Sequence, residues 1–383
     1  MSVINDPLTP SVKCYLAALV AMFTALFGEP AEAHENVQEE PLVQAAPELK
    51  PAEEGRSGEA MFKQACASCH SLEYDSNRDL LTLWDRKGPS LVSAGSKYRD
   101  EWLQDWLQEP VAIRPAGYLA YRRTLVGDDG DKISTAFKDK HLAVDESKAR
   151  LLTDFLAQQQ LPLNPYPAFN GTPVIKGAIH FNKILGCGSC HRVGDKGGVT
   201  GPGFDSASSR YQAQWLTSYM QDPYYWDTVP MPKLRVRSDQ LVAMTDYLML
   251  DRDSALFGEE SAAQVSMREK LYRDKPPQDV SSIEGRAEKI YQIACSQCHG
   301  ISGDGLGLNS SFLAQEPRNH TSAKEMKKLS NEHLFKVIKF GGVSVDKSTL
   351  MPAWGALIKD KDIEALVAYL RQLSQTENPK GRR

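Results

Sequence analysis

Cysteine is almost absent from this chain outside one repeated pattern. Of the seven cysteines in 383 residues, six fall in three copies of C-x-x-C-H and the seventh is Cys14. No cysteine is therefore left over to build a separate disulfide framework. Basic residues are not in excess either, because 45 Lys and Arg stand against 49 Asp and Glu, and the formal net charge is −4. This balance gives no support for nucleic-acid binding.

Long apolar runs are missing after residue 33, so we expect no bilayer-spanning segment there. Before it, the cation Lys13 is followed by an apolar run, 15–28, and by the small residues at 31–33. That order is typical of a secretory signal. We expect residues 1–33 to be a signal peptide, with an uncleaved membrane anchor as the alternative. Residues 34–55, rich in Pro, Glu and Ala, predict a flexible linker.

The repeated motif predicts a covalently bound prosthetic group. Its copies are Cys66, Cys69 and His70; Cys187, Cys190 and His191; and Cys295, Cys298 and His299. Two cysteines one helical turn apart can bond the vinyl groups of a haem, and the next histidine can bind its iron. A zinc half-site or a redox dithiol would not need a histidine after each second cysteine. We therefore expect three molecules of haem c.

The three motifs lie in three similar pieces of chain. Prolines at 162, 165 and 167 and the stretch 274–278 interrupt helical patterns and leave one motif per piece. Each piece has a helix leading into its motif (58–66, 177–187 and 285–295) and ends in an amphipathic helix. We expect domains at 56–160, 168–252 and 282–375, with a linker at 253–281. The fold class predicted is all-α.

Residues 88–110 and 201–223 also match one another, through Gly-Pro, Tyr, Trp-Leu and a final Pro, whereas the third piece diverges. With their motifs, all three pieces resemble class I cytochrome c domains over about residues 52–375. The resemblance implies three tandem small helical folds, each around one haem. It also implies a loop whose carbonyl orients the proximal histidine, matched by Pro89, Pro202 and Pro317.

The same resemblance predicts the sixth ligands of two haems. Met231 and Met351 each lie in a Met-Pro sequence ahead of a final helix, where class I cytochromes c carry the thioether that raises the haem potential. Met220 and Met244 sit at helical spacing and are expected in the core, whereas Met326, in a lysine-rich run, is expected to be exposed.

The first piece has no methionine at this position. Tyr118 aligns with Met231, a turn-rich insertion follows at 126–131, and His141 stands shortly before the last helix. We expect His141 to be the sixth ligand, giving a bis-histidine haem of lower potential. Tyr118, Lys138, Lys140 or an open iron are the alternatives. His320 is expected to bond a backbone group or a haem propionate.

These expectations favour an electron carrier over an enzyme. The first two pieces resemble the c-type domains of cytochrome bc-type, quinol-oxidising complexes, which implies a periplasmic relay from such a complex, or from a membrane dehydrogenase, to a downstream acceptor. The haem is attached outside the cytoplasmic membrane, as the signal also predicts. Membrane association would come through the partner or an uncleaved N-terminal segment. A peroxidase-like or sulfur-oxidising enzyme with an open first haem is the alternative.

Overall fold

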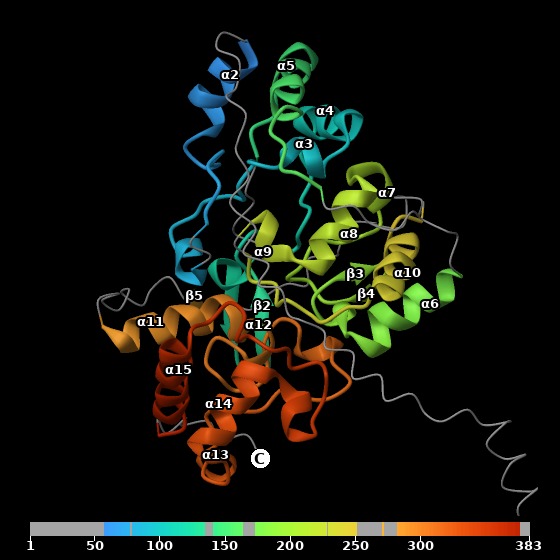
Figure 1. Cartoon of the computed structure of the whole chain (residues 1–383). Coiled ribbons are helices and arrows are strands. Elements are labelled where there is room, and N and C mark those ends of the chain that lie inside the picture. Colours follow the sequence, from blue (N-terminus) through green and yellow to red (C-terminus); the bar gives the residue numbers. More distant parts are fainter. Residues whose placement is uncertain are drawn as a thin grey trace, which may run out of the picture. The chain divides into compact units, whose positions relative to one another are not determined.

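The computed structural model describes residues 57–76, 79–134, 141–163, 173–227, 229–250, 270–271 and 282–375 (Figure 1). The predicted signal at 1–33, the linker at 34–55, the break at 274–278, Lys138 and Lys140 lie outside these residues, as does most of the linker predicted at 253–281. We call the stretches 57–163, 173–250 and 282–375 the first, second and third segments. Each contains one C-x-x-C-H motif.

The first segment is helical apart from one hairpin. Its elements, in which η denotes a 3₁₀ or π-helix, are α2 (Ser57–Met61), η1 (Phe62–Cys66), η2 (Leu80–Leu83), α3 (Ala94–Lys97), α4 (Asp100–Gln108), η3 (Ala120–Arg123), β1 (Thr124–Gly127), β2 (Gly130–Ile133) and α5 (Glu146–Leu156). The carboxylate of Asp145 caps α5 by accepting a hydrogen bond from the Lys148 amide.

The second segment repeats the helical order of the first. Its elements are α6 (Val174–Ile179), η4 (His180–Ile184), η5 (Cys187–Ser189), β3 (Arg192–Val193), β4 (Lys196–Gly197), α7 (Ala207–Arg210), α8 (Ala213–Gln221), α9 (Pro223–Trp226) and α10 (Ser238–Leu248). Helices α7 and α8 correspond to α3 and α4, as the sequence match predicts.

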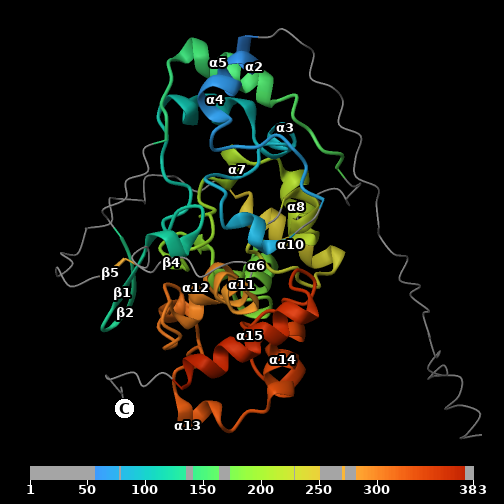
Figure 2. The ribbon, with the colours of Figure 1, turned by 90° about the vertical axis from the view of Figure 1, so that its left-hand side faces the viewer.

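The third segment is built around α15, in the red part of Figure 2. Its elements are α11 (Ile283–Ile290), η8 (Tyr291–Cys295), α12 (Ser296–His299), η9 (Ser310–Phe312), α13 (Ala323–Met326), α14 (Asn331–Phe340), η10 (Gly342–Val345) and α15 (Asp360–Leu373). Ile363, Leu366, Val367 and Leu370 recur at helical spacing along α15, and all four are buried. Their burial explains why α15 packs against α11 and α14.

In every segment the helix leading into the motif packs against the last helix, as the sequence predicts. The pairs are α2 with α5, α6 with α10 and α11 with α15. A side chain at Gly58 would overlap the carbonyl oxygen of Leu151, and one at Gly177 would overlap that of Ala243. Glycine is thus required where these two pairs of helices approach each other most closely.

The leading helices end differently from one another. In the first and third segments a π-helical turn, η1 or η8, runs up to the first cysteine of the motif. In the second segment the π-helical turn stops at Ile184, and the chain turns at Gly186, which has φ +67°. The helix predicted over 177–187 is therefore wrong at its end. Its last residues form a glycine turn instead.

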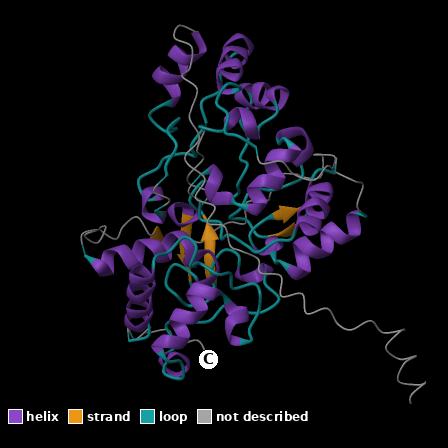
Figure 3. Ribbon diagram, in the orientation of Figure 1, coloured by secondary structure: helices purple, strands orange, loops and turns teal. Residues whose placement is uncertain are grey.

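Two small sheets were not expected from the sequence (Figure 3). The predicted turn-rich insertion is the hairpin β1–β2, and β1 also pairs with β5 (Lys270–Leu271), giving the order β2-β1-β5. Strands β3 and β4 form a second hairpin directly after the second motif. The β1–β2 hairpin reaches the third segment, because the Asp131 amide donates to the carbonyl of Leu306 at 2.8 Å.

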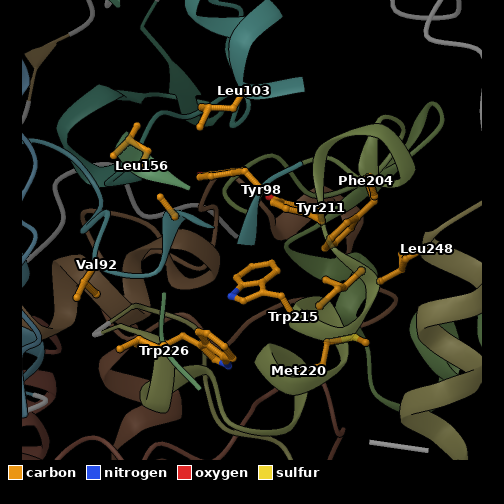
Figure 4. Close-up of a cluster of buried hydrophobic side chains, with 14 of the residues drawn as sticks. Val92, Tyr98, Leu103, Leu156, Phe204, Tyr211, Trp215, Met220, Trp226 and Leu248 are labelled. Carbon is orange, nitrogen blue, oxygen red and sulfur yellow. The ribbon is translucent and has the colours of Figure 1, made fainter. Parts of the chain in front are cut away.

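The buried side chains form two main clusters that cross segment borders. One contains the cores of the first and second segments together, including Tyr98, Tyr211 and Trp215 (Figure 4). The other is centred on the third segment and also takes in Leu80 and Val229. All the described residues fall within one unit, 47–383.

The burial of three methionines agrees with the sequence-based prediction for two of them. Met220 and Met244 are buried as predicted, with 8% and 1% of their surface exposed. Met326 is fully buried, so its predicted exposure is wrong. It lies on α13, where its side chain faces the core while the neighbouring lysines point to solvent. No helix among the described residues combines the length and the hydropathy that crossing a bilayer requires.

Candidate functional site

The three motif histidines share one hydrogen-bonding arrangement. The Nδ1 atoms of His70, His191 and His299 lie 2.8, 3.0 and 3.0 Å from backbone carbonyl oxygens. A carbonyl can only accept, so each Nδ1 carries the proton and each Nε2 keeps a free lone pair for a metal. The same tautomer is thus selected at all three motifs.

The carbonyl partners belong to the loops predicted from the family resemblance. His70 bonds Pro89 and His191 bonds Pro202, as predicted. His299 bonds Arg318, the residue after Pro317 in the predicted loop. In the first two loops a proline follows a glycine, whereas in the third Pro317 itself precedes the bonding residue.

The motif histidine leaves room only for glycine before Pro89 and before Pro202. A Cβ at Gly88 would lie 2.7 Å from Cε1 of His70, and a Cβ at Gly201 would lie 2.6 Å from Nδ1 of His191. No side chain fits at such distances. The repeated Gly-Pro pair therefore closes the proximal face of the first two sites.

At the first motif the structure brings the predicted sixth ligand next to the proximal histidine. The ring centroids of His70 and His141 are 6.1 Å apart. Two imidazoles that bind one iron from opposite sides, each with a metal–nitrogen bond of about 2.0 Å, would have ring centres roughly 6 Å apart. His141 Nδ1 donates to the carbonyl of Leu142 at 3.1 Å, which leaves its Nε2 free. The spacing and tautomers fit a bis-histidine haem.

Burial lowers the pKa of His70, and the partial burial of the otherwise exposed His141 lowers its pKa as well, which favours the neutral form that binds metals. Trp106 packs beside His141 with its ring centroid at 4.5 Å. Tyr118, the alternative ligand, packs instead in the cluster centred on the third segment, beside Arg86 and Arg114. The assignment of His141 stays a prediction, and the two lysine alternatives lie outside the described residues.

The second and third motifs open onto one shared cavity of about 1600 Å³. His191 and Met231 line it from the second segment, and His299 and Met351 line it from the third. Both methionines are half-buried. Each predicted pair of axial ligands therefore faces the same space, although the ligation itself stays a prediction.

Hydrogen-bond donors line this cavity, and one of them has no protein partner. The indole Nε1 of Trp215 is buried and bonds no protein group. Lys97 and Arg114, both from the first segment, line the same cavity, and Arg114 also donates to the carbonyl of Tyr118 at 3.2 Å. The Lys97 ammonium lies 4.7 and 5.0 Å from the ring centroids of Tyr98 and Trp215. A haem carries two carboxylates, and these donors fit that anionic edge.

Burial lowers the pKa of two groups that line this cavity, Lys97 and His191. It lowers the pKa of Lys97 to about 8 and that of His191 to about 4. The latter imidazole is therefore neutral at pH 7 and available as a ligand.

The third motif has an additional buried histidine. The ring of His320 stacks on that of His299, with centroids 4.3 Å apart and planes inclined by 19°. Its Nδ1 shares a hydrogen bond of 3.2 Å with the Tyr291 hydroxyl. The expected backbone bond is therefore replaced by a tyrosine. His320 fixes the plane of the proximal ring in a way that the sequence did not indicate.

The first thiol of each motif is held as a poor nucleophile, whereas hydrogen bonds lower the pKa of one second thiol, Cys190, to about 7. Burial raises the pKa of Cys187 and of Cys295 to about 12 and raises that of Cys66 as well. Thiols held in the neutral form are poor nucleophiles for disulfide exchange. Within the described segments, no group of three or more His, Cys, Asp or Glu side chains is placed to hold a bare metal ion.

Two residues at these sites carry no local motif in the sequence. Arg318 acts from a loop, and Lys97 acts from another segment. One pattern in the sequence points to Lys97: it and Arg210 are cations at matching positions of the two repeats, next to Tyr98 and Tyr211.

Comparison with known proteins supports the chemistry of the third site. A family model described as "Cytochrome C oxidase, cbb3-type, subunit III" matches residues 284–370. No curated protein and no solved structure matches significantly. The matched region contains the third motif, Arg318, His320 and Met351. Residues 284–370 therefore form a c-type cytochrome domain, which implies covalently bound haem c and indicates a haem-based electron-transfer protein.

Proposed function

We propose that this protein is a triheme c-type cytochrome of three tandem class I domains that relays electrons in a respiratory chain. The observation that carries the proposal is the common tautomer of His70, His191 and His299, each held by a backbone carbonyl and each next to a cysteine pair. Bound haem supplies a reversible one-electron iron couple.

Different residues of this chain would bind different parts of each haem. Each cysteine pair would anchor the group by thioether bonds, and each motif histidine would bind its iron. His141, Met231 and Met351 would supply the second ligand and so keep substrates from the iron. Lys97, Arg114 and Trp215 line the cavity of the second site and would bind the haem carboxylates.

The proposed place in the cell follows from the leader-like N-terminus and from the site of haem attachment. The protein acts in the periplasm, receiving electrons from a quinol-oxidising bc-type complex or a membrane dehydrogenase and passing them to a downstream acceptor. It is itself no enzyme, although it can be a subunit of an oxidoreductase complex.

The test is a mass measurement and a redox titration of the protein produced with a haem-maturation system. We expect a mass increase equal to three haems and three low-spin titrating centres, the lowest in potential being the first. A mass increase of fewer than three haems contradicts the proposal.

A second candidate is a haem enzyme with an open iron at the first site. The observation in its favour is that His141 is exposed, so solvent or substrate can compete with it. Carbon monoxide separates the two candidates. Uptake by one haem of the reduced protein favours the enzyme, and no uptake favours the carrier.

A further inference from the structure

The second and third motifs touch each other through their second cysteines. The thiols of Cys190 and Cys298 lie close enough to affect each other's ionisation. These residues are 108 positions apart in the sequence, and each is the cysteine next to a proximal histidine. Because a haem is bonded to cysteine at its edge, the two sulfur atoms mark where two haem edges would lie.

One buried side chain holds this contact together. Asn309, with none of its surface exposed, accepts a hydrogen bond from the Val199 amide at 3.1 Å and donates one to the Thr200 hydroxyl at 2.7 Å. The backbone amide of Asn309 donates to the carbonyl of Gln297, inside the third motif, at 2.8 Å. Asn309 thus bonds the chain on both sides of the junction.

The Asn309 side chain also lies beside both cysteines, because it affects the ionisation of Cys190 and of Cys298. A buried amide with several partners of fixed geometry specifies one relative position of the groups that it joins. The relative position of the second and third motifs is therefore fixed by side-chain hydrogen bonds in addition to apolar contacts.

A second contact joins the same two sites from another direction. A Cβ at Gly186, next to Cys187, would lie 2.5 Å from Cδ2 of Leu350, next to Met351. The loop carrying the proposed sixth ligand of the third site therefore packs on the motif of the second. The shared cavity of about 1600 Å³ exceeds the range of about 300–1,000 Å³ usual for a single small ligand.

We propose that the second and third haems form one coupled pair whose edges meet beside Cys190 and Cys298, with Asn309 as the positioning residue. The inference rests on the proposed function. An electron that leaves one iron reduces the other directly, so one iron is oxidised as its neighbour is reduced. The positive charge of an oxidised haem also makes oxidation of its neighbour harder.

The test uses the full-length holoprotein and begins with its mass. Loss of only the first haem contradicts the triheme proposal but leaves the pair intact, whereas loss of the second or third haem overturns the pair. With both present, we expect a bisignate circular-dichroism signal in the Soret region and a magnetic interaction between two oxidised low-spin haems. A spectrum equal to the sum of separate haems would overturn the inference.

The substitution Asn309→Ala tests the positioning role. We expect it to reduce the bisignate amplitude at least twofold while the haem content stays unchanged. Asn331→Ala is the matched control, because Asn331 bonds Arg371 on the surface and should leave the signal unchanged. An unaltered signal in Asn309→Ala would show that Asn309 does not position the two haems. If that variant does not fold, the magnetic interaction in the wild-type protein still decides whether the pair exists.

Discussion

Tyr98 and Tyr211 occupy equivalent positions in the first and second repeats, and they pair with each other in an isolated antiparallel β-bridge. The Arg99 amide donates to the Arg210 carbonyl, and the Gln212 amide donates to the Lys97 carbonyl, both at 3.0 Å. This reciprocal pairing is what an internal two-fold relationship produces. It explains how a first-segment lysine comes to line the cavity of the second segment.

Replacing Lys97 with Gln should lower the reduction potential of the second haem. A nearby cation disfavours the oxidised haem, so its loss favours oxidation. With an interaction of about 1 kcal/mol, the shift should be on the order of tens of millivolts. Lys97→Arg keeps the charge and should stay near the wild-type value in a spectroscopic titration. Equal potentials in Lys97→Gln and wild type would show that the ammonium does not face the haem.

Replacing His141 with Ala should convert the first haem from a six-coordinate, low-spin centre to a high-spin one that binds carbon monoxide. The distance of 6.1 Å between the His70 and His141 rings is the basis. Absorption spectra of the reduced protein with and without carbon monoxide measure the change. The control is His180→Ala, a histidine whose Nδ1 lies 3.4 Å from the Gln240 amide.

Two outcomes separate the alternatives at this site. His141→Met should keep six coordination and raise the potential, since a thioether favours the reduced iron. An unchanged low-spin spectrum in His141→Ala would transfer the ligand role to another residue of the first segment.

Replacing Met351 with His should lower the potential of the third haem. Axial ligands tune haem potentials over about 0.8 V, and exchange of a thioether for an imidazole should account for roughly 0.1–0.3 V of this range. Met244→Leu, a substitution in the core with 1% exposure, is the control for general repacking. A third haem that titrates as in wild type would show that Met351 is no ligand.

The sequence predicts local features of this protein better than its long-range contacts. The motifs and the leading and final helices follow from residues within a few turns of each other, and the Pro89 and Pro202 loops follow from the family resemblance. Asn309 could not be identified, because the partners of its side chain, Val199 and Thr200, lie more than 100 residues away. Met326 was misplaced because surrounding charge outweighed helical periodicity in the prediction.

Gly201→Ala should destabilise the second site, whereas Gly203→Ala in the same loop should be tolerated. A Cβ at Gly201 would lie 2.6 Å from Nδ1 of His191, but a Cβ at Gly203 would have its nearest neighbour at 3.8 Å. Overpacking of this kind costs about 1–3 kcal/mol. Denaturant unfolding followed at the haem absorption of both variants measures the difference. Equal stabilities would contradict the close contact between glycine and histidine.

The docking of the β1–β2 hairpin on the third segment should weaken as the pH rises. Asp131 accepts a hydrogen bond from the Ile301 amide at 2.8 Å, and burial raises its pKa to about 7. An unfolded Asp ionises near pH 4, so the folded state binds the extra proton between about pH 4 and 7. Stability should therefore fall across that window and level off above it.

The loss should amount to at most a few kcal/mol, from a pKa shift of about 3 units at about 1.4 kcal/mol each. Amide exchange at Ile301, compared between wild type and Asp131→Asn at each pH, removes the intrinsic pH dependence of exchange. The variant should lack the additional loss of protection between about pH 4 and 7. Parallel behaviour of the two proteins would mean that Asp131 is already ionised when the hairpin is docked.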